Sequence, residues 1–595
     1  MADRDRDWDF HLRTLSNIAR DSNVANDPAS DPNVLLSVRR LYELCKAENS
    51  EDLVARVYPQ FNKIFQRSVS SLSQSRTSNG LLLLAILQFF IDFGEVVLHD
   101  ADSSLKTFFR SCLSREFADL IVAEAVLEFL NTNQNKFLTS FPTLLPQFYP
   151  LLLKLIAWNG EKLEKPFLRI FPALISPGSF LPMFPSLIDF PILVVALERV
   201  ERSSGSLVGN NIASIQKSKV PEMLLALMDE AYTGSTIGDG GGDSGTEASS
   251  TIDVADPLFL ELLKDENDGL SERHWNSPGM TAVIQIAINT AQSDRLKQML
   301  NVTPRILDVY FSVALQDVNN SLICALIPLL MSRNSTLLPD KAFSYKVRKR
   351  LLEFMLAAFQ RSPDFIALLK KPIINRLGEA YDNPAKTELA LQLCWAIGEH
   401  GGGGRSHKDA ARELFESLEL LLYENLLSRW LYDNYPCIHF QNFPFLICCF
   451  SLVCFQSRLG LRQDSGDNSS GESFRKSSQS RLLCFVITAI AKLATYHREL
   501  LPRARVSLGK VARSRTSDAR VWTRAHDYLG LLSDTGISLS ILGPSKPASK
   551  EAHNPGTVNW SQGGTKMVAH IPFYILHEQG PPFHDFSFSD ILPRR

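Results

Sequence analysis

The sequence lacks the features that mark secreted and membrane-spanning proteins. Its nine cysteines include no C-x-x-C pair, and this odd, unpatterned set indicates free thiols in a reducing compartment. The charged N-terminus is followed by no apolar stretch, so it is not a signal peptide. The longest apolar runs, residues 81–93 and 443–455, are thirteen residues long, against the ~20 that span a bilayer. We therefore expect a soluble, cytoplasmic chain with peripheral membrane contact.

Signatures of catalysis and cofactor binding are also missing. The sequence contains no G-x-x-x-x-G-K-[ST], H-E-x-x-H or G-x-S-x-G. Residues 240–245 match G-x-G-x-x-G but lack the preceding strand and following helix that would bind a phosphate. His400 and His407 bracket a run of glycines without the spacing of metal ligands. We predict no catalytic residue, no cofactor, no metal site and hence no enzyme.

The charge balance argues against a general nucleic-acid-binding protein. The formal net charge is −2, whereas a general nucleic-acid binder is expected to be strongly basic.

At 595 residues the chain exceeds the roughly 250–300 residues that one hydrophobic core accommodates. A helical repeat protein avoids that limit, because each repeat buries its apolar face against its neighbours.

The apolar residues recur at helical spacing along most of the chain. Residues 117–130 and 282–299 each show one apolar and one polar stripe, and no stretch alternates with the period of a strand. Prolines between positions 142 and 191 predict helix starts, and hence short helices over residues 151–158 and 166–174. The fold class predicted is an all-α, HEAT- or armadillo-like solenoid of helical hairpins.

Two segments are poor in large apolar residues and are predicted to be linkers. Residues 233–251 are rich in Gly, Ser and Asp, and residues 462–481 are rich in Ser, so burial would not offset their ordering entropy. The organisation predicted is an N-terminal solenoid, a central solenoid, C-terminal helices and an irregular tail, over residues 1–232, 252–461, 482–543 and 544–595 respectively.

A basic stretch stands out near the C-terminus. Residues 498–524 contain eight Lys or Arg residues and only two acidic ones. Five are predicted to contact an anionic surface, either an acidic partner or lipid headgroups; they are Arg503, Arg505, Lys510, Arg513 and Arg515. The alternative is a solvated face of the terminal helices.

Three widely separated stretches of the chain have sequences that resemble those of a known family. They are residues 141–159 with 171–174, residues 394–399, and residues 491–494 with 500–504 and 508–511. Together they resemble the zeta subunit of adaptor protein complex 5, and the W-x-x-G-E element of the second is similar to one in large adaptin trunks. The structural family residues are Trp158, Asn159, Trp395, Gly398 and Glu399.

We expect these family residues to have structural roles rather than to form a binding site. We expect Trp158 and Trp395 to wedge between repeats as buried aromatic side chains. Gly398 is expected to end its helix in the left-handed conformation. Glu399 is expected to satisfy the N-terminus of the next helix.

The resemblance implies the large subunit of a heterotetrameric vesicle adaptor that sorts membrane proteins at late endosomes and lysosomes. The partners implied are a beta-type large adaptin, the medium and small subunits, spatacsin and spastizin. Neither predicted linker carries a clathrin box and no ear is expected after Leu542, so clathrin assembly is not predicted. The alternative function is a stand-alone HEAT-type scaffold for nuclear transport or DNA repair.

Overall fold

The computed structural model describes most of the chain. The described residues are 2–20, 31–48, 50–72, 79–204, 257–270, 293–334, 336–338, 340–380, 386–401, 407–434, 468–514 and 518–542. Within these ranges the regular structure is helical and contains no strand, which confirms the all-α prediction. Two compact units are formed: Met1–Val318 with Leu338–Val347, and Asn319–Leu337 with Arg348–Arg595. We call them the N-terminal and C-terminal units.

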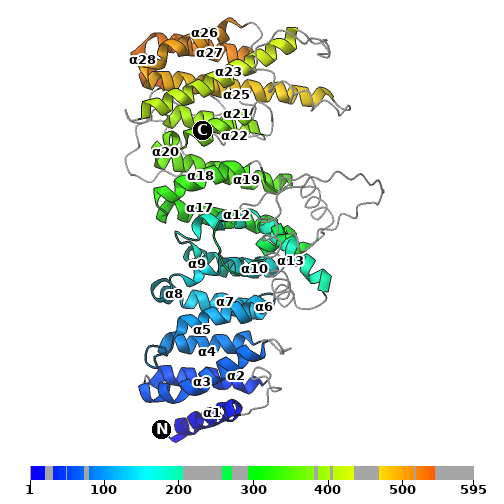
Figure 1. Ribbon diagram of the computed structural model, residues 1–595, viewed down its shortest axis with the longest axis vertical. Coiled ribbons are helices and arrows are strands. Elements are labelled where there is room, and N and C mark those ends of the chain that lie inside the picture. The colour runs from blue at the N-terminus through cyan, green and yellow to red at the C-terminus, as the bar shows by residue number, and fades with distance from the viewer. Residues whose placement is uncertain are drawn as a thin grey trace, which may run out of the picture. The chain divides into compact units, whose positions relative to one another are not determined.

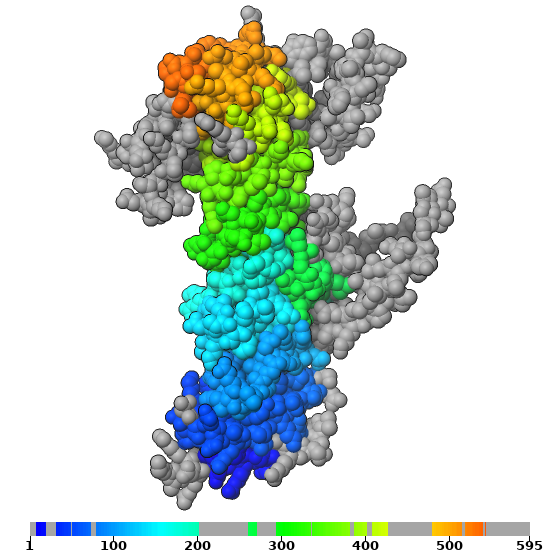
Figure 2. All heavy atoms as spheres, turned by 60° about the vertical axis from the view of Figure 1, so that its left-hand side comes forward, coloured from blue at the N-terminus to red at the C-terminus, as the bar shows by residue number. Residues whose placement is uncertain are grey.

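The N-terminal unit begins as a stack of helical layers that follow one another in chain order (Figure 1). Its first elements are α1 (Ala2–Arg20), α2 (Pro32–Glu48), α3 (Glu51–Ser71), α4 (Gly80–Phe93), α5 (Ala101–Thr107), the π-helical turn η2 (Phe108–Leu113), α6 (Ser114–Glu116), α7 (Leu120–Thr132) and α8 (Gln134–Ser140). The space-filling view shows the same order as bands of colour from blue to cyan (Figure 2). Each layer therefore buries its apolar residues mainly against its neighbours in sequence, as a solenoid requires.

Helix α4 illustrates how these layers are held. It is apolar around most of its circumference, because α2, α3 and α7 all pack against it. Phe89 meets Phe61 of α3 edge-on, with ring centroids 4.8 Å apart. At the next layer Asp119 caps α7 by accepting a hydrogen bond from the backbone N–H of Ile121 at 2.9 Å. Core aromatics thus hold α4 against its neighbours, and the Asp119 cap fixes where α7 begins.

The proline-rich part of the N-terminal unit consists of short helices. They are α9 (Leu144–Gln147), α10 (Tyr149–Asn159), η3 (Gly160–Leu163), α11 (Glu164–Ile170), η4 (Phe171–Leu174) and α12 (Phe180–Ile188). The short helices predicted over residues 151–158 and 166–174 are thus confirmed. Pro150 lies in the first turn of α10 and Pro172 in that of η4, where the missing N–H has no intrahelical partner to lose.

Further described helices of the N-terminal unit are α13 (Phe190–Ser204), α15 (Pro257–Leu262) and α17 (Asp294–Asp317). Tyr310 of α17 is fully buried, and its ring stacks on Phe180 with centroids 5.2 Å apart. Its hydroxyl donates to the Phe180 carbonyl at 2.8 Å, so the polar end of this large side chain is satisfied inside the core.

The C-terminal unit contains α18 (Asn320–Asn334), α20 (Asp364–Leu368), α21 (Lys370–Glu379), α22 (Thr387–His400), α23 (Lys408–Asn434), α25 (Asn468–Tyr496), η7 (Arg498–Leu500), α26 (Leu501–Arg513), α27 (Ala519–Ser533) and α28 (Thr535–Leu542). Helix α19 (Lys341–Arg361) belongs to the N-terminal unit up to Val347 and to the C-terminal unit from Arg348. Helix α25 packs against α22, α23 and α27, and is therefore the central helix of this unit.

The predicted linkers have different outcomes. Residues 233–251 and 462–467, like the predicted tail from residue 544, lie outside the described residues. The linker prediction is wrong over residues 468–481, because α25 begins at Asn468. Once the apolar part of α25 is packed, each further residue extends the helix by one hydrogen bond without a new nucleation cost. The boundary between the units near residue 318 also differs from the divisions predicted at the linkers.

Among the described helices, no single one is both long and apolar enough to cross a membrane. The pair Phe180–Ile188 and Phe190–Glu201 meets both criteria only when the two helices are taken together, and they are bent by 68° at their junction.

Candidate functional site

The second and third distinctive stretches of the sequence meet in the C-terminal unit. Residues 394–399 lie on α22 and residues 491–494 lie on α25, and these two helices pack against each other. A Cβ atom on Gly398 would lie 3.2 Å from Ala489 Cα and 3.3 Å from Lys492 Cδ. Glycine at this position therefore lets the two helix backbones approach closely.

A buried ion pair connects α22 and α25 at this contact. Lys492 Nζ donates to Glu399 Oε1, and the two side chains are 2% and 8% exposed. Burial lowers the pKa of Lys492 well below its usual value, because desolvation disfavours the charged ammonium. The facing Glu399 carboxylate is the group that compensates this cost, so the pair specifies which helices meet.

One role predicted for this element is wrong. Gly398 does not end its helix in the left-handed conformation, since α22 continues to His400 and the described positive-φ glycines are Gly160 and Gly269. Glu399 forms an ion pair with Lys492 of α25. The sequence pattern did not reveal Lys492 as the partner, because it lies 93 positions away.

The two tryptophans differ in their surroundings. Trp158 at the end of α10 is 8% exposed, and the Arg295 guanidinium carbon lies 3.8 Å from the centroid of its ring. Asn159 donates to the carbonyls of Phe117 and Leu155, both at 2.9 Å. Trp395 is only partly buried and meets His400 edge-on at 6.0 Å. Trp158 and Asn159 thus join α10 to neighbouring layers.

His400 and His407, the two histidines that bracket the run of glycines, have different surroundings. His400 ends α22, and burial lowers its pKa to about 4. His407 lies 3.6 Å from a carboxylate oxygen of Asp364. Among the described residues, no group of three His, Cys, Asp or Glu side chains is placed to hold a metal ion.

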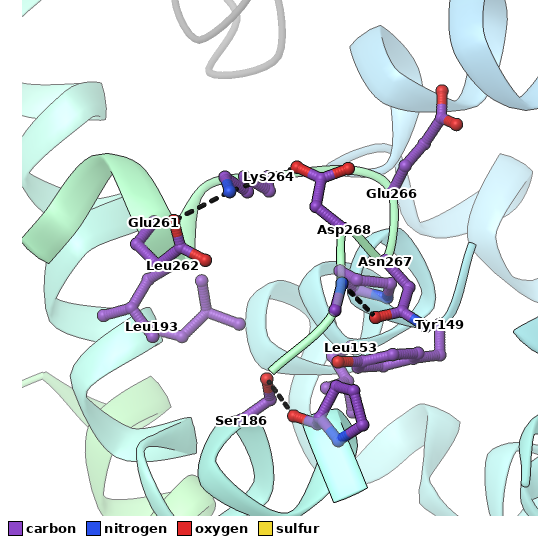
Figure 3. Close-up of a pocket in the computed structure, with 13 residues that line it drawn as sticks. Tyr149, Leu153, Ser186, Leu193, Glu261, Leu262, Lys264, Glu266, Asn267 and Asp268 are labelled. Atoms are coloured by element: carbon purple, nitrogen blue, oxygen red, sulfur yellow. Dashed lines mark hydrogen bonds and ion pairs between the residues drawn. The ribbon is translucent and has the colours of Figure 1, made fainter. Parts of the chain in front are cut away.

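The first distinctive stretch contributes a second buried lysine. Lys154 of α10 is fully buried and donates to Asp265 Oδ1 at 2.8 Å and to the Leu263 carbonyl. We call residues 263–269 the strap, because this segment crosses the first turn of α10 (Figure 3). Two backbone bonds reinforce it: Leu151 N donates to the Asp265 carbonyl at 3.3 Å, and Asn267 N donates to the Gln147 carbonyl at 2.7 Å.

Glu266 connects the strap to η2 and α9. It accepts from Arg110 Nε at 2.6 Å and from Gln147 Nε2 at 2.6 Å. The hydrogen bond from Arg110 is the main reason why the pKa of Glu266 lies below its usual value. The strap thus supplies partners for side chains on η2 and α9 through Glu266, and for the Leu151 N–H and the Lys154 ammonium of α10 through Asp265.

The space beneath the strap is small. Tyr149, Leu153, Leu193 and Lys264 are among its lining residues, and Lys264 Nζ lies 2.8 Å from Glu261 and 3.1 Å from Asp268 (Figure 3). The cavity measures about 30 Å³. That is room for a water molecule rather than a cofactor, so the strap serves the fold.

The basic stretch is not gathered into one exposed cluster. Arg503 is held by Glu416 at 2.9 Å and Glu419 at 2.5 Å on α23. Arg505 donates to the Leu532 carbonyl at 2.6 Å. Lys510, by contrast, extends over the Tyr423 ring, and Arg513 donates to the Gly509 carbonyl at 3.0 Å. Arg515 lies outside the described residues.

A shallow groove lies between α7 and α11. It has a volume of about 500 Å³, with Glu124 and Glu128 on one wall and Lys162 and Arg169 on the other. Asn131, which also lines the groove, joins the two helices by donating to the Pro166 carbonyl at 2.9 Å. None of the four charged side chains forms an ion pair with another described residue. Sequence reasoning missed this groove, because its walls come from separate layers.

Comparison with known proteins identifies the class to which this helical architecture belongs. A family model described as "AP-5 complex subunit, vesicle trafficking" matches residues 29–154. A second, described as "AP-5 complex subunit zeta-1, C-terminal TPR repeats", matches residues 245–440 and 467–559. The two matches place the chain in a class of helical-repeat proteins whose models are described as subunits of a vesicle-trafficking complex. More narrowly, it belongs to the AP-5 complex subunit zeta-1 family.

Two curated relatives carry the same name. AP-5 complex subunit zeta-1 of Mus musculus is 24% identical over 476 residues, which cover 78% of this chain and 50% of the mouse protein. Its Homo sapiens counterpart is 24% identical over 514 residues, covering 83% and 54% respectively. The chain therefore spans about half the length of the curated relatives it matches. No solved structure gives a significant match.

The strap contact leads to a stability prediction. Replacing Asp265 with Ala leaves the fully buried Lys154 ammonium without its carboxylate, so the free energy of unfolding should fall by about 3 kcal/mol. The control is Asp268→Ala, whose carboxylate pairs with the partly exposed Lys264 and should cost under about 0.5 kcal/mol. Urea unfolding of both variants measures the difference, and equal losses would contradict the assigned role of Lys154.

The α22–α25 contact leads to a second stability prediction. Gly398→Val forces a branched side chain against the α25 backbone and should destabilise the protein by about 1–3 kcal/mol. Gly378→Val on α21 is the matched control, because no atom lies within 4 Å of its added Cβ and the effect should stay within about 0.5 kcal/mol. Thermal melting compares the two, and an unchanged Tm for Gly398→Val would show that the helices do not need this close approach.

Proposed function

We propose that this chain is the non-catalytic helical trunk of a heterotetrameric vesicle adaptor. The observation that carries the proposal is the AP-5 zeta-1 family match, which falls on the helical repeats of both compact units. A trunk of this kind supports other subunits along an extended surface, so sorting arises from the assembly. Its partners would be a beta-type large adaptin and the medium and small subunits of adaptor protein complex 5.

The groove between α7 and α11 is where we place one of these contacts. Its opposed acidic and basic walls suit a partner segment that carries charges of both signs, because each wall then meets its opposite. Ile121 precedes Glu124 and Glu128 on the same stripe of α7 and is 64% exposed, which adds apolar area beside the charges. Mixed polar and apolar rims of this kind are common where subunits meet.

The cellular setting follows from the family resemblance. We propose that the complex is recruited from the cytoplasm to late endosomal and lysosomal membranes, where it sorts membrane proteins. Spatacsin and spastizin would be further partners there. Membrane contact would be peripheral, through the assembled complex and local basic surface.

A stand-alone scaffold in nuclear transport or DNA repair is the competing function. It would need a broad basic surface for nucleic acid or acidic partners, and the formal net charge of −2 speaks against one. The family match favours the adaptor.

The test is affinity purification of the tagged full-length chain from its own cells in mild salt, followed by mass spectrometry. We expect near-equal amounts of a beta-type adaptin and the medium and small subunits. Glu124→Lys with Glu128→Lys should reduce the recovery of at least one of them about tenfold, because one wall of the groove reverses its charge.

The control for this experiment carries the same change of charge elsewhere. Glu95 and Asp317 are exposed and lie outside the groove, so Glu95→Lys with Asp317→Lys should leave recovery unchanged. Recovery of importins or chromatin factors in place of adaptor subunits would contradict the adaptor function. Equal recovery with both double variants would contradict the groove as a contact.

A further inference from the structure

Helix α26 has an unusual charge composition for a surface helix. Its thirteen residues include four basic side chains and no acidic one. Ala504, Ser507, Leu508 and Val511 are buried, which fixes the side that faces the rest of the unit. Helical geometry places Val506, Lys510 and Arg513 together on the opposite side, and all are exposed.

The charges on this helix are not equally available. Arg503 points toward α23, where Glu416 and Glu419 compensate it. Lys510 contacts the ring and hydroxyl of Tyr423, and Arg513 contacts a backbone carbonyl, so their partners are uncharged. Within the described part of the chain, neither forms an ion pair with a carboxylate. Both therefore keep their full positive charge toward solvent.

An aromatic side chain adjoins this helix from α27. Trp522 donates its indole N–H to the Ala512 carbonyl of α26 at 2.6 Å, so its polar end is satisfied within the hairpin. The ring is nevertheless 42% exposed, and Val506 on α26 is 54% exposed. Exposed aliphatic and aromatic side chains thus accompany the cations on this pair of helices, a combination typical of the boundary between lipid headgroups and acyl chains.

We propose that Lys510 and Arg513, flanked by Val506 and Trp522, form a face that docks on an anionic lipid surface. An acidic protein segment would pair with the cations alone and would leave the exposed apolar side chains without a role. Arg503 is excluded because its charge is already compensated. The inference rests on the proposed function only in supposing that the adaptor works at a membrane; lipid binding by this face is measurable without the other subunits.

The experiment uses the full-length chain and sedimented vesicles of phosphatidylcholine with about 30% phosphatidylserine, an anionic content typical of strong surface fields. We expect binding that requires phosphatidylserine and weakens as salt shortens the Debye length. Lys510→Gln with Arg513→Gln should weaken binding at least about tenfold, since each cation near such a surface contributes about fivefold. Val506→Ser should weaken it about threefold with the same salt dependence, because it removes apolar contact only.

A matched control has the same loss of charge in the N-terminal unit. Arg56 and Lys63 are exposed on α3 and form no ion pair with another described residue, so Arg56→Gln with Lys63→Gln should bind vesicles like the wild type. All variants should keep the wild-type Tm, because every substituted side chain is exposed.

Three outcomes would overturn the lipid proposal. They are a wild-type chain that does not bind phosphatidylserine vesicles, equal weakening of the α26 variant and the α3 control, and normal vesicle binding by the α26 variant together with lost recovery of an adaptor subunit. The last would assign the face to a protein partner. A chain that binds vesicles through α26 but recovers no adaptor subunits would contradict the proposed function and leave this inference standing.

Discussion

Two fully buried lysines impose the main constraint on this structure. An ammonium group removed from water needs a carboxylate close by, and each lysine finds one on a distant segment. Lys154 meets Asp265, 111 positions along the chain, and Lys492 meets Glu399, 93 positions back. Each pair therefore decides which segments of a repetitive helical chain lie together. The strap depends on the first pair and the α22–α25 contact on the second.

Apolar packing alone specifies such contacts poorly. The cores of both units consist mainly of Leu, Ile, Val, Phe and Ala, and hydrophobic residues of similar size replace one another with modest loss of stability. A buried charge has far fewer acceptable surroundings, so a wrong helix pairing would leave it uncompensated. We interpret both lysines as residues that select the correct pairing. This explains why the distinctive residues of the sequence lie at structural contacts rather than in a catalytic site.

Local sequence patterns predicted the positions of many helices, but they did not predict which helices pack against each other. Proline positions were sufficient for the short helices around α10 and α11, because proline acts on its own helix turn. The Ser-rich composition of residues 468–481 was misleading, since α25 extends backward from a packed apolar segment. The role predicted for Gly398 was wrong and the partner Lys492 of Glu399 was missed for the same reason: both residues make contacts across a helix pair.

The sequence by itself determined the all-α class, the absence of recognised catalytic signatures and the family, because these depend on composition, periodicity and short ordered elements. Only the tertiary structure decided which charges are available on the surface. Arg503 and Lys510 have similar sequence surroundings, yet Arg503 is held by two carboxylates of α23 and Lys510 extends over a tyrosine ring. That difference arises because the neighbours of each side chain come from another helix, more than eighty positions away in the sequence, and only helix packing brings them together.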